Sequence, residues 1–333
     1  MKKNLFSLLP LSAVVMTMAS GAVLAQSGIS LYGVADAGLV VENGNGRHTN
    51  ISSGVASGSR IGFKGKEDLG GGLAANFVLE SGFSLDTGAS GQGGLLFGRQ
   101  AYVGLSGTAG AVTLGRQYSP YYLALRDIAD PFVIGLAGTA SNLMETNIRI
   151  NNMVQYSTPK VNGFGADVAY GFGEKPDSNT SNRSIGATLS YDNGPLTASL
   201  NHHRHDNVGA TDQSKNTLLA AKYNFRVLQV HLGYADNKAL AAVKSNDVLL
   251  GLTVPFGANS LLVSYIRHND KSAANLDASQ WALGGLHRLS KRTDLYLAYA
   301  RINNQNGAAF KVGNATDDGT GNSGINLGMR HTF

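Results

Sequence analysis

The segment Arg183–Tyr191, which reads RSIGATLSY, carries the pattern that decides the fold. From Ile185 onward, Ile, Ala, Leu and Tyr occupy every second position, and small or polar residues occupy the positions between them. Successive side chains of a β-strand point to opposite sides, so this alternation predicts a strand with one apolar face. Leu228–Tyr234, Leu250–Phe256 and Ile325–Phe333 repeat the pattern.

The second face of these segments is small and polar, which argues against a soluble β-sandwich. The facing sides of a sandwich are filled with apolar side chains, whereas Ser, Thr, Gly and Asn suit a water-filled lumen. An even number of antiparallel strands of about 9–11 residues, joined by alternating short and long connections, builds an outer-membrane barrel. We predict sixteen strands, at roughly 28–41, 58–68, 72–84, 95–106, 110–118, 147–158, 163–173, 182–192, 195–204, 215–226, 227–237, 246–256, 259–268, 278–289, 292–303 and 322–333.

The composition excludes several other classes of protein. Hydrophobic residues make up 43% of the 333 residues, and the mean hydropathy is −0.07, too low for a bundle of membrane-spanning helices. The 43 Gly residues show no three-residue collagen period, and 13 Tyr plus 12 Phe argue against disorder. The sequence has no Cys, which excludes disulfide scaffolds, thiol catalysis and Fe–S clusters.

The N-terminus predicts export. Two lysines, an apolar stretch (5–18) and small side chains at positions 23 and 25 form a signal-peptide pattern. We therefore expect residues 1–25 to be cleaved and residues 26–333 to form the transmembrane barrel. The formal charge of +5 falls to +3 when the two lysines are removed. The remaining basic residues are scattered singly, so we expect no nucleic-acid partner.

One connection differs from the others. Short turns such as Asp192–Pro195 and polar stretches such as Asn43–Ser57 and Asn303–Asn322 have the composition of surface loops. The stretch between Arg116 and Asn147 instead combines an absence of alternation with many apolar and aromatic residues. Sixteen strands enclose a channel too wide for wall side chains to fill. We therefore expect this segment to fold into the lumen and pack there.

Several motifs resemble the Gram-negative general porins, in particular the neisserial and Burkholderia-like branch. The motifs are Ser59–Leu73, Leu79–Phe83, Gly98–Leu105 and Leu114–Tyr118, and the similarity extends over essentially the whole mature chain. The resemblance implies a homotrimer of sixteen-stranded barrels in the outer membrane, surrounded by lipid and lipopolysaccharide. It also implies that the third extracellular loop, Ser119–Thr146, folds inward and narrows each pore. The barrel-assembly machinery would read a C-terminal signature ending in Phe333.

The resemblance further implies a charged constriction. Its members would be a basic ladder on the wall (Arg60, Arg99 and Arg149), a wall carboxylate near the same level (Glu80), two loop acids (Asp127 and Asp130) and two cations just off that level (Arg116 and Lys64). The alternation supports part of this set, because Arg60 and Lys64 share a face opposite two apolar residues. An Arg facing lipid at the midplane costs about 2–4 kcal/mol, so this face should point into water. For Arg99 only the family position indicates the lumen.

These observations predict a passive channel for ions and small hydrophilic solutes, with a mild anion preference and no enzymatic activity or cofactor. The alternatives are a plugged adhesin or hydrolase barrel, and a substrate-specific porin. Gly319–Gly324 matches G-x-G-x-x-G, but a strand follows it and not a helix, so a loop is favoured over a dinucleotide site. His202, His203 and His205 suggest a metal, but alternation puts His202 on the face opposite the other two, so we expect no metal site.

Overall fold

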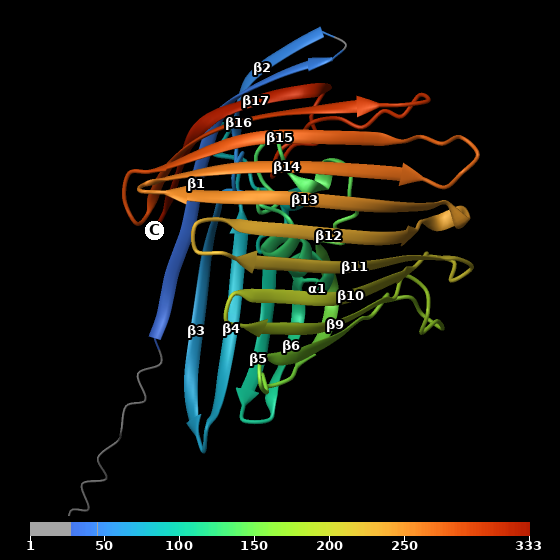
Figure 1. Cartoon of the computed structure of the whole chain (residues 1–333). Helices are drawn as coiled ribbons and strands as arrows, with labels where there is room; N and C mark the ends of the chain where they lie inside the picture. The colour runs from blue at the N-terminus through green and yellow to red at the C-terminus, as the bar shows by residue number, and fades with distance from the viewer. Residues whose placement is uncertain (1–27, 45) are drawn as a thin grey trace, which may run out of the picture.

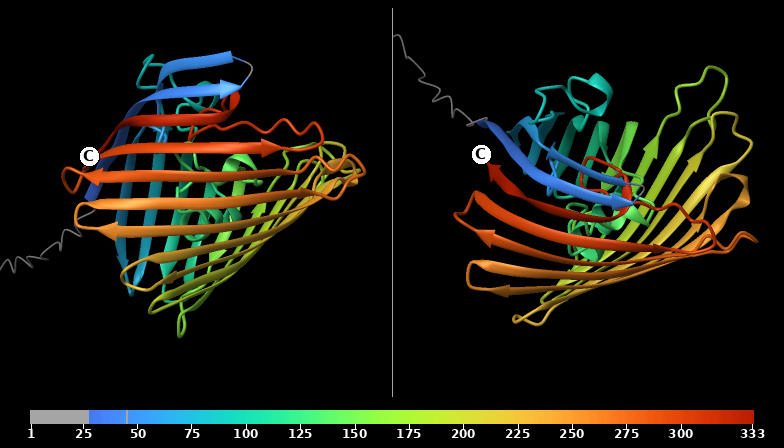
Figure 2. Two further views of the ribbon diagram at one scale, coloured as in Figure 1. Left: turned by 45° about the horizontal axis from the view of Figure 1, so that its top comes forward. Right: turned by 90° about the horizontal axis from the view of Figure 1, so that it is seen from above.

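The computed structural model describes residues 28–44 and 46–333, so the expected signal peptide lies outside the described residues. Seventeen strands form a single sheet around a short helical segment (Figures 1 and 2). The strands are β1 (Gly28–Gly44), β2 (Gly46–Ser53), β3 (Arg60–Gly70), β4 (Leu73–Gly82), β5 (Gln100–Gly107), β6 (Gly110–Tyr118), β7 (Arg149–Ser157), β8 (Phe164–Gly171), β9 (Ser184–Asn193), β10 (Leu196–Asp206), β11 (Gln213–Asn224), β12 (Gln229–Lys238), β13 (Lys244–Phe256), β14 (Asn259–Asp270), β15 (Ala278–Arg288), β16 (Thr293–Asn304) and β17 (Gly321–Thr332). The helical pieces are η1 (Gln92–Gly94), α1 (Pro120–Ala124), η2 (Leu125–Ala129), η3 (Ala140–Asn142) and η4 (Leu240–Ala242).

The sheet closes on itself. From β3 to β17 each strand pairs antiparallel with the next, and β17 pairs with β1. On its other side β1 pairs with β3 through Gly28–Val34 and with β2 through Ala37–Gly44. Because β2 and β3 share one position in the ring, the seventeen strands form a sixteen-stranded barrel. The predicted fold is confirmed.

Strand β2 corrects one detail of the sequence interpretation. We expected Asn43–Ser57 to be a polar loop, but most of it pairs with the end of β1 as a hairpin. At 17 residues, β1 is longer than the 9–11 residues that cross a bilayer. The last residues of β1 can therefore pair with β2 beyond the hydrocarbon core. A strand there needs no apolar face, so the sequence of β2 reads like that of a loop.

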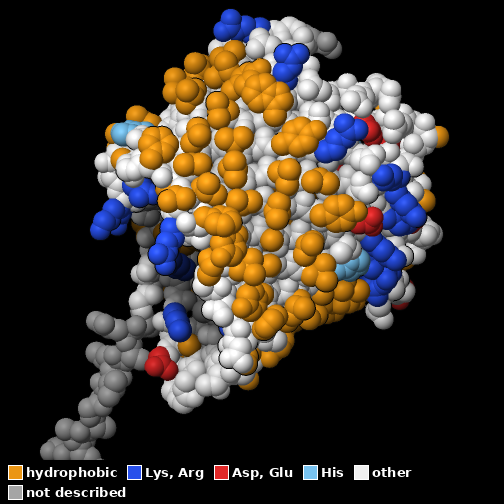
Figure 3. Space-filling view, viewed as in Figure 1, with side chains coloured by type: hydrophobic (Ala, Val, Ile, Leu, Met, Phe, Trp, Pro, Cys, Tyr) orange, Lys and Arg blue, Asp and Glu red, His pale blue; other side chains and the backbone are white. Residues whose placement is uncertain are grey.

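The outer surface carries a broad apolar band. Leu200, Leu219, Leu232 and Leu250, on four neighbouring strands, are all about half exposed and face outward, and Figure 3 shows the apolar side chains covering this wall. Hydrocarbon cannot hydrogen-bond to the backbone, and a closed ring of strands pairs every backbone group in the wall. Within the described residues, no helix is long and apolar enough to cross a membrane.

The barrel closes at a seam formed by β1, β17 and β16, and Tyr296 packs there across two glycines. Tyr296 is the cross-strand neighbour of Gly328, and Gly328 is the neighbour of Gly38. A Cβ at Gly38 would stand 2.6 Å from the Tyr296 hydroxyl, so the ring lies flat only because both neighbours lack a side chain. The hydroxyl then donates to the fully buried carboxylate of Asp36 at 2.8 Å.

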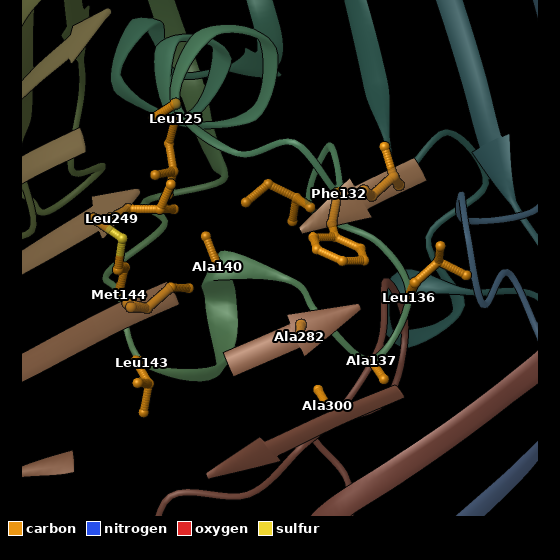
Figure 4. Packing of buried hydrophobic residues seen from close by; sticks show 14 of the residues in the cluster. Leu125, Phe132, Leu136, Ala137, Ala140, Leu143, Met144, Leu249, Ala282 and Ala300 are labelled. Atoms are coloured by element: carbon orange, nitrogen blue, oxygen red, sulfur yellow. The ribbon is translucent and has the colours of Figure 1, made fainter. Parts of the chain in front are cut away.

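The segment between β6 and β7 lies inside the barrel, as Figure 2 shows from above. Its apolar residues pack on one another and on the wall. Figure 4 shows Leu125, Phe132, Leu136, Leu143 and Met144 of the loop beside Leu249, Ala282 and Ala300 of the wall. A Cβ at Gly251 would lie 2.7 Å from Pro131, and one at Gly284 would lie 2.7 Å from Phe132. The small wall residues therefore provide the room in which the third loop folds inward.

The far end of the chain completes the ring. Gly33 and Phe333 exchange both backbone hydrogen bonds at 3.1 Å, and the Phe333 ring covers Gly33 so closely that a Cβ there would overlap it.

We predict that deleting Phe333 lowers the yield of folded barrel, because two backbone bonds and the ring contact at the seam are lost together. The yield is measured as the heat-modifiable band on electrophoresis of outer membranes. Phe333→Tyr, which keeps the ring and both bonds, should fold at wild-type levels. A deletion variant with an undiminished folded band would contradict this role.

Candidate functional site

Of the cavities within the barrel, two meet at the inward loop, one on each side of it. The larger, about 960 Å³, opens toward the long connections and is lined in part by Asp86, Asp317 and Asp318. The smaller, about 610 Å³, opens toward the short turns and includes Lys64 and Phe333. The residues that line both cavities are Arg60, Arg99 and Arg126. These three guanidinium groups therefore mark the junction between the two halves of the lumen.

Glu80 binds two of these arginines. Its Oε1 accepts from Arg99 Nε at 2.8 Å, and its Oε2 lies 3.7 Å from Arg60 Nε. The Tyr32 hydroxyl also donates to Oε2, at 3.0 Å. Glu80 is only 4% exposed, and a buried carboxylate is stable only when it is paired and hydrogen-bonded in this way. Glu80 thus holds Arg60 and Arg99 side by side on the wall.

Tyr118 contacts three arginines. Its hydroxyl oxygen accepts from Arg99 Nη2 at 2.7 Å and from Arg149 Nη2 at 3.2 Å. The Arg149 guanidinium also lies over the Tyr118 ring, 4.8 Å from its centroid. Tyr122 stacks on Tyr118 at 5.0 Å, and Arg126 lies over both rings at 5.4 and 5.5 Å. Such cation–π contacts attract each guanidinium to the face of the ring.

The strand boundaries explain why these side chains share one level. Arg60 and Arg149 are the first residues of β3 and β7, and Glu80 lies near the end of β4. Arg99 comes immediately before β5, and its backbone N–H donates to the Glu80 carbonyl at 3.1 Å. Because Arg99 precedes the strand, the alternation of β5 does not govern its direction, and it points into the lumen although its parity is that of the outward-facing Val103.

Arg126 is a member of the cluster that the sequence interpretation missed. It projects from η2 of the inward loop and lines both cavities. A signal was present, because Tyr122 and Arg126 are four residues apart, a spacing that places both on one face of a helix. The loop therefore contributes a cation to the level where we expected it to contribute only acids.

The two loop acids take different positions. Asp127 lines the larger cavity and forms a two-pronged ion pair with its neighbour Arg126, at 2.7 and 2.8 Å. Lys222 of β11 donates to the Asp127 backbone carbonyl at 2.9 Å and so ties the loop to the wall. Four arginines, Arg149 included, thus stand near two acids, Glu80 and Asp127, for a local formal charge of +2.

The expectation that Asp130 faces the arginine ladder is wrong. Asp130 is 1% exposed and lines neither cavity. Its carboxylate accepts from the backbone N–H groups of Phe132, Ile134 and Ala140, each at 2.9 Å. Ile134 and Leu136 have positive φ angles of 53° and 57°, so this stretch needs a buried acceptor for the N–H groups that its irregular backbone leaves unpaired. Asp130 stabilises the loop and is not part of the pore lining.

The two cations expected just off this level have different surroundings. Lys64 lines the smaller cavity and lies 5.2 Å from the centroid of the Tyr32 ring. Arg116 lines neither of the two cavities. Its guanidinium donates to the Gly98 carbonyl at 2.7 Å and to the side-chain oxygen of Asn151. Lys64 can therefore act on a solute in the lumen, whereas Arg116 bridges neighbouring parts of the wall.

Residues 12–307 match the Gram-negative porin family. The chain belongs to this family. It is 35% identical to the outer membrane porin protein 32 of Delftia acidovorans and 30% identical to an outer membrane porin protein of Bordetella pertussis, with full coverage of all chains. It superimposes on an anion-selective porin from Comamonas acidovorans with a TM-score of 0.82 and 32% identity, covering 92% of this chain and 100% of that one.

Family and fold together establish the general activity. The chain is a porin of the Gram-negative outer membrane, and it forms a water-filled channel through which small solutes diffuse. Porins are channels and not enzymes, which sets aside the alternative of a plugged adhesin or hydrolase.

The buried position of Asp130 predicts a pH-dependent stability. Burial raises the pKa of the Asp130 carboxyl to about 6 from an ordinary value of 3.8, although three backbone N–H groups oppose the shift. The folded protein then takes up a proton at a higher pH than the unfolded chain, so this residue adds stability as the pH falls from about 6 toward 3.8.

The measurement is the free energy of unfolding in urea, followed by the fluorescence of the single Trp. The free energy of unfolding of wild type, minus that of Asp130→Asn, should rise by up to about 3 kcal/mol as the pH falls from 7 to 4, since each pKa unit corresponds to about 1.4 kcal/mol. Asp127→Asn, at an exposed acid, serves as the control. A difference that is constant or shrinks over this range would contradict the assignment.

Proposed function

We propose that solutes pass a constriction formed by Arg60, Arg99, Arg126 and Arg149, and that this constriction gives the porin a mild preference for anions. The observation that carries the proposal is that three arginines line both cavities, so that a solute crossing from one to the other passes within contact distance of them. The similar Comamonas porin is described as anion-selective, which supports the proposal.

The electrostatic argument depends on distance. The charge of the whole molecule matters little to a passing ion, because salt screens charges beyond about 8 Å at physiological ionic strength. Within that distance the low-dielectric wall and loop focus the field of the arginine cluster into the lumen. Each unit charge in wet surroundings is worth about 1 kcal/mol at about 4 Å. The local excess of two positive charges then favours anions several-fold.

We further propose that Ser119–Thr146 is the constriction loop, within a barrel domain of residues 26–333 that follows a cleaved signal peptide of residues 1–25. The loop's apolar packing against the wall supports this role, because a rigid loop can define a size limit. As the family resemblance implies, the functional unit is a homotrimer in contact with outer-membrane lipid and lipopolysaccharide. The barrel-assembly machinery would recognise Phe333, so its deletion should leave cleavage after Ala25 intact.

The wall arginines give the first test of selectivity. Replacing Arg60, Arg99 and Arg149 together with Ser should shift the zero-current potential in a KCl gradient toward cation preference, because only Arg126 then faces the two acids. Larger solutes should also enter, since three long side chains leave the lumen. The measurement is made on purified protein in a planar bilayer.

The control for this experiment replaces three exposed cations outside the lumen, Lys291, Arg292 and Arg301, with Ser. This variant loses the same charge and should keep the wild-type potential. If both triple variants behave like wild type, the arginine cluster does not determine selectivity.

The loop gives a test of size exclusion. Deleting Ile128–Gly138 removes Asp130, Phe132 and Leu136 but no hydrogen bond between strands, so the barrel should still fold while its conductance and size limit increase. The measurements are single-channel conductance and the swelling rate of proteoliposomes in sugars of increasing mass. A folded deletion variant with unchanged conductance would place the loop outside the conducting path.

A further inference from the structure

Asp36 is a buried carboxylate in the barrel wall that no cation neutralises. It lies on β1 and is fully buried, and among the described residues no ion pair engages it. A buried charge without a partner is unfavourable unless hydrogen bonds compensate it. The Tyr296 hydroxyl at the seam provides one such bond. An apolar residue could close the seam without this cost, so the seam alone does not explain the carboxylate.

The other partners of Asp36 are backbone groups of the connection between β2 and β3. The N–H groups of Ser57 and Ala56 donate to Asp36 Oδ2 at 2.9 and 3.2 Å, and the Gly54 N–H donates to the Asp36 backbone carbonyl at 2.7 Å. We call Gly54–Ser57 the clamp segment. It lies outside the strands, so its N–H groups need acceptors other than a neighbouring strand. Asp36 provides them and thereby fixes the clamp segment to the wall.

The clamp segment contacts the tip of the inward loop. The Val55 carbonyl accepts from the Leu136 N–H at 2.8 Å, and both residues are buried in the packed core of the lumen; Figure 4 labels Leu136. Gly135 lies so close to the clamp segment that a Cβ there would overlap the Ala56 carbonyl oxygen. The Asp36 carboxylate is thus connected to the loop tip through two or three residues of backbone.

The connection also contacts the arginine side of the passage. Arg60 Nη1 donates to the carbonyl of Gly58, the residue after the clamp segment, at 3.0 Å. A Cβ at Gly58 would lie 2.7 Å from Arg99 Nη1. One short stretch of backbone therefore touches the inward loop on one side and two wall arginines on the other. The width of the passage between these two sides depends on where that stretch is held.

We propose that Asp36 is a positioning residue of the channel, which holds the tip of the inward loop at a fixed distance from Arg60 and Arg99. This inference rests on the proposed constriction. The loop has a second anchor, because Gln280 Nε2 donates to the Gly138 and Thr139 carbonyls at 3.1 and 3.3 Å. Loss of the Asp36 carboxylate should therefore leave the loop inside the barrel, with a tip that moves.

The test is Asp36→Ala, studied as purified mature protein in a planar bilayer. A moving tip should appear as brief current steps in single-channel records. Their frequency should rise about tenfold or more, the factor that corresponds to losing a hydrogen bond to a charged acceptor. Asp36→Asn should restore the wild-type record, because its amide oxygen can accept from Ala56 and Ser57 while its NH2 group donates to the Tyr296 oxygen.

Tyr296→Phe separates the clamp from the seam. It removes the bond between Tyr296 and Asp36 but leaves both backbone bonds to the clamp segment, so the folded barrel should lose thermal stability while the current record stays wild-type. A Tyr296→Phe variant with as many current steps as Asp36→Ala would show that the seam is responsible, and would overturn the proposal.

Gly135→Ala tests the same contact from the loop side and leaves the seam intact, in case Asp36→Ala does not fold. The added Cβ overlaps the Ala56 carbonyl, so this variant should also show frequent current steps. Gly285→Ala is the matched control, because a Cβ there would have nothing within 4 Å. Wild-type records from a folded Asp36→Ala, or from Gly135→Ala, would overturn the role of Asp36. The Ile128–Gly138 deletion tests the constriction separately, because it removes the tip itself.

Discussion

Every backbone N–H and C=O group in the hydrocarbon core must find a partner within the protein, and this constraint determines the architecture of the porin. A closed ring of strands meets it, and sixteen strand positions make a ring too wide for wall side chains to fill. The wall is therefore free to carry small and polar residues inward, and the space is occupied by a loop. The glycines and alanines of β11–β13, β15 and β16 provide much of the surface on which this loop packs.

The charged cluster is a consequence of that packing. Four guanidinium groups gathered near one level repel one another, and the structure compensates with one buried carboxylate and one stacked pair of tyrosines. Glu80 bridges Arg60 and Arg99, while Tyr118 accepts hydrogen bonds from two arginines and presents its ring to two. The loop acids contribute less, because Asp127 is engaged by Arg126. The cluster can thus remain cationic toward the lumen although it is densely packed.

The fold was predictable from the sequence because period-two alternation is a local signal that repeats through the whole chain. The parity argument also placed Arg60 and Lys64 correctly on the inner face. It failed where a residue lies outside a regular strand: Arg99 precedes β5, and β2 has the composition of a loop. The role of Asp130 was not predictable, because nothing local to its position indicates that an irregular backbone will surround its carboxylate. Arg126 could have been found from its helical spacing with Tyr122, four residues before it.

The central claim is that the narrowest part of the lumen carries a net positive charge. The zero-current potential of a single wild-type channel in a tenfold KCl gradient tests this most directly. The account predicts a potential of the sign that corresponds to chloride preference, decreasing toward zero when the same gradient is imposed at molar salt, where the screening length is about 3 Å. A potential of the opposite sign, or one that does not respond to salt, would contradict it.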